Sequence, residues 1–169
     1  SDSASASIRV NNVAPAVDAG ADRTIAEGGS FSAGGSFTDP GADTWTATVD
    51  YGDGSGVQPL VLNPDKTFAL AHAYADDGTY TVTVTVSDDD SGVGSDTLGV
   101  TVDNVDPGVN AGADRTIDEG GTFSQSGSFT DPGADTWTAT VDYGEGAGPQ
   151  PLTLTGMGLK FSSLVLDLS

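Results

Sequence analysis

Two stretches of this chain have nearly the same sequence. Val13 to Leu62 and Val105 to Leu154 are offset by 92 positions, and 39 of their 50 aligned residues are identical. Identity this high over this length indicates a duplication, and a fixed period indicates an array in which each repeat folds as a similar unit. Any fold proposed for the chain must therefore accommodate the same local structure twice.

Strict alternation of apolar and polar residues predicts β-strands. From Thr79 to Val86, every second residue is Tyr or Val and the residues between are Thr, which is the pattern of a strand with one buried face. No segment shows the apolar spacing of a helix. Three further inward-facing sets are predicted: Trp45, Ala47, Val49 and Tyr51; Phe68, Leu70, His72 and Tyr74; and Leu98, Val100 and Val102.

Turn-forming residues separate these strands, as in Asp39-Pro40-Gly41 and Gly52-Asp53-Gly54. Phe31 and Phe37 belong to an earlier strand, in which the pair Gly34-Gly35 predicts a bulge. The 92-residue offset is close to the length of an immunoglobulin-like sandwich, about 100 residues. The sequence thus predicts an all-β fold of tandem immunoglobulin-like β-sandwiches, the second one truncated.

The repeat also predicts the domain boundaries. Residues 1–12 are expected to be the end of a preceding repeat or linker, and residues 13–102 a complete sandwich. Residues 103–106 form a linker, and residues 107–169 a partial second repeat with a divergent tail. The tail after Leu154 does not resemble the matching part of the first repeat. Because the last three strands of the second repeat are missing and their partner strands would be bare, we expect poor order beyond about Leu154.

The charge of the chain is strongly acidic, with 25 acidic and 5 basic residues and a formal net charge of −20. Such a surface repels nucleic acid and anionic membranes, and no apolar run is long enough to cross a bilayer. There is no cysteine, so disulfides do not stabilise the fold. All but three of the acids are aspartates, which favour turns and cation-binding loops, although a salt-adapted acidic surface is the alternative explanation.

Several motifs together resemble the polycystic-kidney-disease (PKD) repeat. They are Gly52-Asp53-Gly54 after a strand, His72-Ala73-Tyr74, and the strand that begins Asp77-Gly78-Thr79-Tyr80. Val49 stands where the family usually has Trp, and the second repeat carries Gly144-Glu145-Gly146. The resemblance implies an extracellular immunoglobulin-like module that serves in adhesion, in spacing, or as an accessory beside secreted hydrolases and proteases. It also implies similarity, for some members, to calcium-binding modules.

Catalysis is not expected. His72 is the only histidine and occupies an inward-facing strand position within the family motif, which favours a structural role. Paired carboxylates can hydrolyse glycosides, but the acids here lie in turns and no substrate cleft is indicated. We therefore predict that the chain is not an enzyme.

Calcium is the predicted cofactor, because it takes about six to eight oxygen ligands from carboxylates, carbonyls and water. In an immunoglobulin-like sandwich the N-terminus, the loop between the second and third strands and the last hairpin loop share one end. A second group is expected at the module junction, and each acidic loop has the ordinary turn as its alternative. The ten candidate ligands are Asn12, Asp39, Asp43, Asp88, Asp89 and Asp90 in the first group, and Asp103, Asn104, Asp131 and Asp135 in the second.

Two functions remain open on this basis. The first is a non-catalytic spacer or adhesion module of a large secreted or cell-surface repeat protein, stiffened by calcium at its module junctions. The second is a carbohydrate- or protein-binding accessory module of a secreted hydrolase or protease. The expected partners are neighbouring modules of the same chain and an extracellular protein or glycan, with no nucleic acid and no membrane insertion. The outward positions are mainly Thr, with no aromatic stripe, which favours the first function.

Overall fold

The computed structural model describes residues 4–155, 160–161 and 166–167 of the chain. Within them the fold is all-β, as predicted, and contains no helix that could span a membrane. The chain divides into two compact units, unit 1 (Ser1–Asp103) and unit 2 (Asn104–Ser169), which are described separately here. The finer domain boundaries given above remain predictions.

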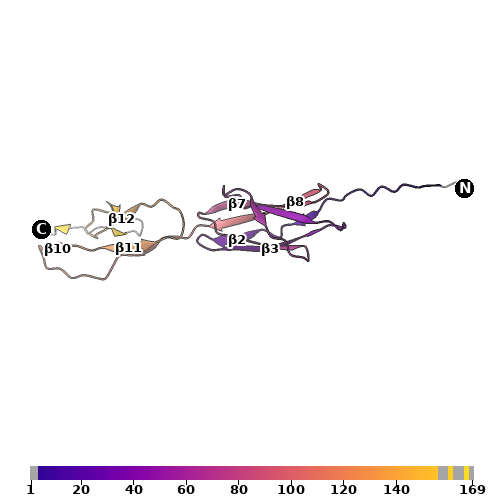
Figure 1. Cartoon of the computed structure of the whole chain (residues 1–169). Helices are drawn as coiled ribbons and strands as arrows, with labels where there is room; N and C mark the ends of the chain where they lie inside the picture. The colour runs from indigo at the N-terminus through magenta and orange to yellow at the C-terminus, as the bar shows by residue number, and fades with distance from the viewer. Residues whose placement is uncertain (1–3, 156–159, 162–165, 168–169) are drawn as a thin grey trace. The chain divides into compact units, whose positions relative to one another are not determined.

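Unit 1 is a sandwich of two sheets (Figure 1). One sheet has the strand order β1-β3-β6, and the other has the order β2-β8-β7-β4-β5, in which only the β2–β8 pairing is parallel. The strands are β1 (Ala16–Asp18), β2 (Arg23–Ala26), β3 (Phe31–Thr38), β4 (Trp45–Asp50), β5 (Gln58–Leu60), β6 (Thr67–His72), β7 (Gly78–Asp88) and β8 (Val93–Asp103).

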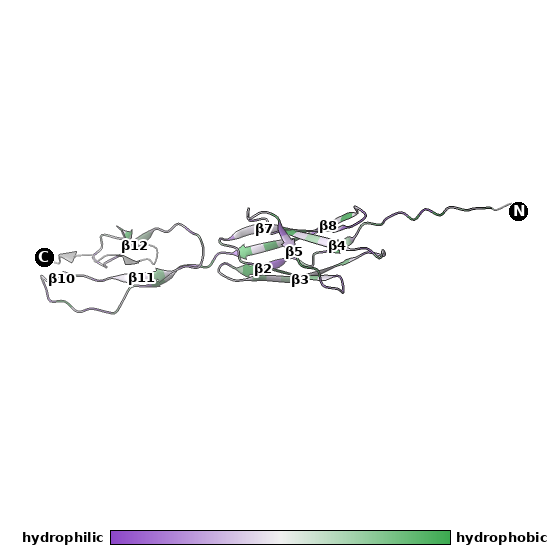
Figure 2. Ribbon diagram, in the orientation of Figure 1, coloured by the Kyte–Doolittle hydropathy of each residue, from purple (hydrophilic) through white to green (hydrophobic). Residues whose placement is uncertain are grey.

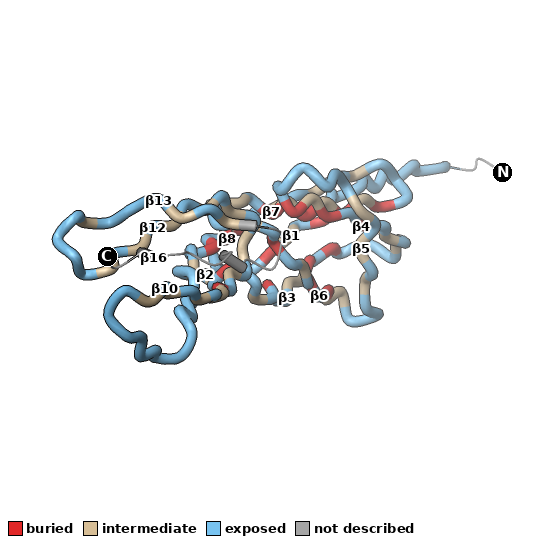
Figure 3. Tube along the Cα trace, turned by 90° about the vertical axis from the view of Figure 1, so that its left-hand side faces the viewer, coloured by how far each residue is buried: buried red, intermediate tan, exposed pale blue. Residues whose placement is uncertain are grey.

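The predicted alternation is confirmed in the core of unit 1. Val82, Val84 and Val86 of β7 are fully buried, while the threonines between them lie on the outer face. Hydrophobic and hydrophilic positions alternate along the strands of unit 1 (Figure 2), and the buried residues gather in the same strands (Figure 3). Each fully buried aliphatic side chain contributes about 1.5–3 kcal/mol to folding. The β7–β8 hairpin supplies six of these core residues: Val82, Val84, Val86, Leu98, Val100 and Val102.

The bulge predicted at Gly34-Gly35 is wrong. The pairing of β3 with β6 runs without interruption from Phe31↔His72 to Ser36↔Thr67. The glycine at position 35 instead provides space, because a Cβ there would lie 2.4 Å from two ring carbons of Phe68 and 2.6 Å from the carbonyl oxygen of Asp18. Glycine in a strand can thus mark a close side-chain approach as well as a bulge.

Unit 2 contains eight strands in its described residues. A four-stranded sheet has the order β14-β15-β11-β9, and two further pairs are β10–β16 and β12–β13. The expectation of poor order beyond Leu154 falls largely outside the described residues. The strands are β9 (Gly108–Asn110), β10 (Thr122–Phe123), β11 (Gly127–Thr130), β12 (Ala139–Val141), β13 (Gln150–Leu152), β14 (Leu154–Thr155), β15 (Lys160–Phe161) and β16 (Leu166–Asp167).

Two of the strand pairings formed by the duplicated sequence recur in both units. Phe37 pairs with Val17 in unit 1, and Phe129 pairs with Val109 in unit 2. Likewise, the β4–β5 pair of unit 1 and the β12–β13 pair of unit 2 share one register. Part of the local structure expected from the duplication is therefore present twice, whereas residues 115–118, the counterparts of β2, are not in a strand.

The close contact at Gly35 gives the first prediction. We expect Gly35→Ala to lower the free energy of unfolding of unit 1 by about 1–3 kcal/mol, since the added methyl overpacks the Phe68 ring. Gly34→Ala is the matched control, because its Cβ would meet only the Phe68 carbonyl oxygen at 3.7 Å, an ordinary contact. Urea denaturation of both variants measures the difference, and equal stability would contradict the packing role.

Candidate functional site

Three carboxylates converge at one end of unit 1. Asp39 follows β3, Asp43 lies in the same loop before β4, and Asp88 is the last residue of β7. Strand pairing brings the loop and the hairpin together, because Trp45 lies opposite Asp88 in the β4–β7 ladder. Oxygen atoms of the three carboxylates all lie within 4.8 Å of one another. The grouping of these loops that topology predicted is thus present in unit 1.

Asp39 is buried and held by its own loop. Its Oδ1 accepts the amide of Gly41 at 2.9 Å, and its Oδ2 accepts the indole Nε1 of Trp45 at 3.0 Å. The amide and the indole, with the charge of Lys66 nearby, hold the pKa of Asp39 below its usual value. The Lys66 Nζ donates to the Asp39 carbonyl at 2.6 Å and lies 4.3 Å from the centre of the Trp45 ring.

Asp88 is also buried, and it fixes the N-terminal segment to the hairpin. Its Oδ1 accepts the amide of Gly92 at 2.6 Å, which closes the β7–β8 turn. Its Oδ2 accepts the side-chain Nδ2 of Asn12 at 2.9 Å. Asn12 therefore connects the segment that enters unit 1 to a residue 76 positions further along the chain.

Asp43 differs from the other two carboxylates. Its Oδ2 is buried without a hydrogen-bond partner. The pKa of Asp43 is raised, mainly because the carboxylate is removed from water. The negative charges of Asp39, Asp89 and Asp90 raise it further. The negative charge of a buried carboxylate oxygen in this position can be neutralised either by a proton or by a cation.

The remaining predicted ligands lie nearby, at the opposite end of unit 1, or in unit 2. Asp89 is exposed and its Oδ1 accepts the amide of Thr44 at 3.1 Å, while Asp90 is exposed in the β7–β8 turn. Asp103 ends β8, and its carbonyl accepts the amide of Glu27 at 2.9 Å. Asn104 is the first residue of unit 2 and is exposed. A shared junction site remains a prediction.

The Asp39 loop is rebuilt in unit 2. Asp131 accepts the amide of Gly133 at 3.1 Å and the indole Nε1 of Trp137 at 3.0 Å. These are the bonds that Asp39 accepts in unit 1. Asp131 and Asp135 are both half-buried in the loop between β11 and β12. The indole bond was not predicted, although the recurrence of Asp-Pro-Gly-Ala-Asp-Thr-Trp in both repeats was a signal for a closed loop.

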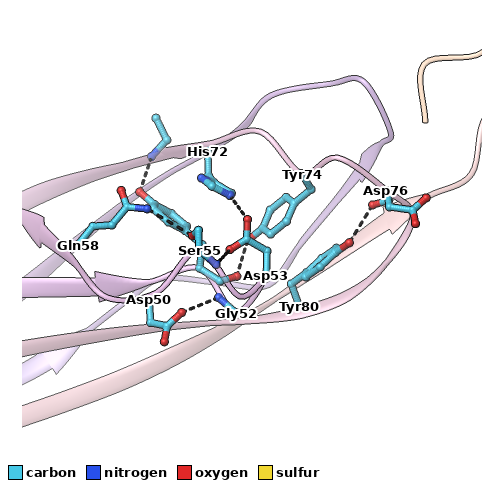
Figure 4. Close-up of polar contacts among 11 residues, drawn as sticks. Asp50, Gly52, Asp53, Ser55, Gln58, His72, Tyr74, Asp76 and Tyr80 are labelled. Atoms are coloured by element: carbon cyan, nitrogen blue, oxygen red, sulfur yellow. Dashed lines mark hydrogen bonds and ion pairs between the residues drawn. The ribbon is translucent and has the colours of Figure 1, made fainter. Parts of the chain in front are cut away.

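A second polar cluster, which was not predicted as a site, lies at the opposite end of unit 1. His72 Nε2 lies 2.7 Å from Asp53 Oδ2 (Figure 4). The imidazole also stacks on the ring of Tyr51, with ring centres 4.2 Å apart. Hydrogen bonds from the hydroxyl and the amide of Ser55 hold the pKa of Asp53 well below its usual value, and the bond to His72 lowers it further. The Nε2 of His72 is thus held by a carboxylate.

Aromatic rings extend this cluster through the core. Tyr74 stacks on Tyr80 at 4.2 Å, and its hydroxyl donates to the Tyr51 carbonyl at 3.1 Å. Burial raises the pKa of Tyr74 to about 12. The Gly52 amide donates to Asp50 at 2.9 Å to shape the turn that carries Asp53 (Figure 4). Gly52 has φ +75°, and a Cβ there would lie 2.5 Å from the Thr81 carbonyl oxygen, so the turn requires glycine.

The family assigned by comparison with known proteins agrees with the sequence motifs. A family model described as a PKD domain matches residues 12–102. Among solved structures, the chain is similar to the PKD domain of an M14-like peptidase from Thermoplasmatales archaeon SCGC AB-540-F20, with 23% identity, a TM-score of 0.45 and coverage of 54% of this chain and 98% of that chain. It is also similar to the PKD domain of human KIAA0319, with 19% identity, a TM-score of 0.35 and coverage of 59% of this chain and 91% of that chain. None of the curated proteins matches the chain.

The lowered pKa of Asp53 gives a pH prediction. A carboxylate whose folded pKa is depressed stabilises the fold above its unfolded pKa, near 3.8, and this contribution is lost as the pH falls toward the folded pKa. We expect Asp53→Asn to lower the free energy of unfolding by about 1 kcal/mol at neutral pH, a value reduced for partial exposure. The difference from the wild type should shrink as the pH is lowered below about 4.

Ser55→Ala is the graded comparison, since it removes one of the bonds to Asp53 and leaves the His72 contact in place. We expect a smaller loss of stability than in Asp53→Asn. Urea denaturation at a series of pH values measures both. A wild-type minus Asp53→Asn difference that stayed constant through this pH range would contradict the role of Asp53.

Proposed function

Because this chain belongs to the PKD domain family, we propose that it is a non-catalytic extracellular spacer or adhesion module whose N-terminal end binds and is stiffened by calcium. The family match covers residues 12–102, more than half of the 169 residues. PKD domains are typically extracellular adhesion or spacer modules, and they also occur in peptidases. The observation that carries the calcium proposal is the buried, unpartnered oxygen of Asp43 between two other carboxylates.

The donor set fits calcium. Oxygen ligands lie at about 2.3–2.6 Å from a bound Ca²⁺, so two ligands of one ion are at most about 5 Å apart. The carboxylate oxygens of Asp39, Asp43 and Asp88 meet this limit at 4.8 Å. Each carboxylate oxygen has two lone pairs, so the amide and indole bonds to Asp39 leave it free to act as a ligand. Backbone carbonyls and water would complete the coordination.

Asn12 gives the proposed site a mechanical role. It precedes β1 and already contacts Asp88 through its amide nitrogen. Rotation of that amide by half a turn would present the oxygen Oδ1 to the ion in place of the nitrogen. A cation held by Asn12, Asp43 and Asp88 would therefore fix the entering segment to the sandwich, which restricts bending between successive modules.

The electrostatics favour a cation at this end. Asp89 and Asp90 add two further negative charges beside the three converging carboxylates. Like charges at short distance repel, and a divalent cation removes the repulsion while replacing the water that the buried oxygens have lost. By sequence position, Asn104, Asp131 and Asp135 are the corresponding donors of unit 2, and we propose a second site there.

The accessory function has less support. The outer positions of β7 and β8 are mainly Thr and Ser, such as Thr79, Thr81 and Thr101, and offer no aromatic platform for a sugar. A glycan array and a collagen pull-down test this alternative. Saturable binding to either ligand would favour an accessory function over a spacer.

Calcium should stabilise unit 1. For a dissociation constant in the extracellular class, about 10⁻⁴–10⁻³ M, about 10 mM calcium raises the free energy of unfolding by about 1.4–2.7 kcal/mol. Calorimetric melts in calcium and in chelator measure this effect. An unchanged melting temperature of unit 1 would overturn the proposal.

The effect of Asp43→Asn on the melting temperature of unit 1 should change sign when calcium is added. Without the cation the variant should melt at a higher temperature than the wild type, because it removes the repelled charge whose pKa is raised. With calcium it should lose most of the stabilisation that the wild type gains. Asp50→Asn is the matched control, since it removes one charge at the opposite end of unit 1 and retains an oxygen for the Gly52 amide. It should leave the calcium response intact.

A further inference from the structure

Lys66 occupies a backbone position that favours glycine or asparagine. It is half-buried in the turn between β5 and β6 and has φ +63°. The Lys66 amide donates to the Asn63 carbonyl at 3.0 Å, and the Asn63 amide donates to the Thr67 carbonyl at 2.8 Å, which closes the turn. Lysine is uncommon in this left-handed region, because its Cβ crowds the backbone. Strained positions of this kind concentrate at functional sites, so the Lys66 side chain is a candidate for a function.

The side chain of Lys66 reaches the Asp39 loop. Its Nζ donates to the Asp39 carbonyl at 2.6 Å and lies 4.3 Å from the centre of the Trp45 ring. The Lys66 carbonyl accepts the Phe37 amide at 3.0 Å, next to the β3–β6 ladder. The backbone and the side chain of Lys66 thus both contact the segment that carries Asp39.

The ammonium of Lys66 places a positive charge beside the proposed calcium site. It bonds to the backbone of Asp39, while the Asp39 carboxylate accepts the Gly41 amide and the Trp45 indole. The amide and the indole lower the pKa of Asp39 most, and the charge of Lys66 lowers it further. A fixed positive charge that acts on this carboxylate also repels a divalent cation bound to it.

We propose that Lys66 determines the calcium affinity of unit 1: its ammonium holds the Asp39 loop in place in the absence of metal and weakens the binding of a divalent cation there. This inference rests on the calcium site proposed above and names a residue that regulates it. The chain has 5 basic residues against 25 acidic ones, so a lysine beside this group of carboxylates is not expected from composition alone.

A purely structural Lys66 would have the opposite effect on calcium binding. If Lys66 only held the loop, its removal would loosen Asp39 and weaken the binding of calcium. If its charge opposes the ion, its removal should strengthen calcium binding. In both cases the metal-free unit 1 should become less stable, because the Asp39 carbonyl loses the bond from Lys66. The sign of the change in calcium affinity therefore distinguishes the two roles.

The experiment is a calcium titration of the intact, isotope-labelled chain, followed by NMR through the indole N–H signals. The chain has two tryptophans, and each indole donates to the aspartate of its own loop, Trp45 to Asp39 and Trp137 to Asp131. The two signals therefore report the two units separately. Trp137→Phe assigns them, because it removes one signal.

Lys66→Met keeps the apolar stem beside Trp45 and removes the ammonium. We expect the calcium dissociation constant measured at Trp45 to fall by about three- to tenfold, because the positive charge no longer repels the ion. Lys66→Asn is the second variant, since asparagine tolerates the left-handed backbone and also removes the charge. It should change the dissociation constant in the same direction.

Two control variants separate the local charge from other effects. Lys66→Arg retains the charge and should keep the dissociation constant within about twofold of the wild type. Arg23→Gln removes one positive charge elsewhere in unit 1. Arg23 is exposed in β2 and pairs with Val100, near the Asp103 end of β8 and away from the turn that follows Asp88. This variant should leave the affinity measured at Trp45 unchanged.

The outcomes distinguish this inference from the calcium site on which it rests. Equal or weaker calcium binding by Lys66→Met and Lys66→Asn, in a chain whose wild type responds to calcium, would overturn the role of Lys66 and leave the site standing. An equal gain in affinity in Lys66→Arg would also overturn that role, since charge would not be its cause. If the Trp45 signal responds to calcium in neither the wild type nor the variants, the site and this inference are both overturned.

Discussion

The β7–β8 hairpin is the contact through which the other strands of unit 1 are held together. Ten residue pairs join its two strands, from Gly78↔Val102 to Ser87↔Val93. β4 pairs with its β7 edge and β2 with its β8 edge, while its inward side chains meet Phe31, Phe37 and Phe68 of the opposite sheet. Because apolar burial is the main favourable term in folding, removal of this hairpin would leave both sheets with an exposed inner face.

The hairpin also brings the charges of the proposed metal site together. Its turn carries Asp88, Asp89 and Asp90 to the loop that contains Asp39 and Asp43, because the β4–β7 register places Trp45 opposite Asp88. The same pairing that buries the valines thus forces five carboxylates toward one end. Folding and charge repulsion are coupled here, and a proton on Asp43 or the proposed bound cation would relieve the repulsion.

Much of this structure could be predicted from the sequence. The alternation of apolar and polar residues predicted the inward faces of β4, β6, β7 and β8. The topology of an immunoglobulin-like sandwich predicted the grouping of Asn12 with Asp39, Asp43 and Asp88. What could not be predicted depends on side-chain contacts across the sandwich. Gly35 indicates a bulge from sequence alone, and only the position of the Phe68 ring shows that the glycine provides space. The Asp53–His72 pair was missed as a site, since its partners are 19 residues apart and meet only after β4 and β6 are in place.

The two repeats differ in a way that distinguishes contacts within the duplicated segment from contacts to residues outside it. Asp39, Gly41 and Trp45 bond to one another within the duplicated segment, and Asp131, Gly133 and Trp137 form the same bonds in unit 2. Asp53 instead pairs with His72, which lies outside the duplicated segment, and the second repeat has Glu145 at the position of Asp53. The Asp39 loop, whose partners were copied with it, retains its geometry, whereas Asp53, whose His72 partner was not copied, has changed.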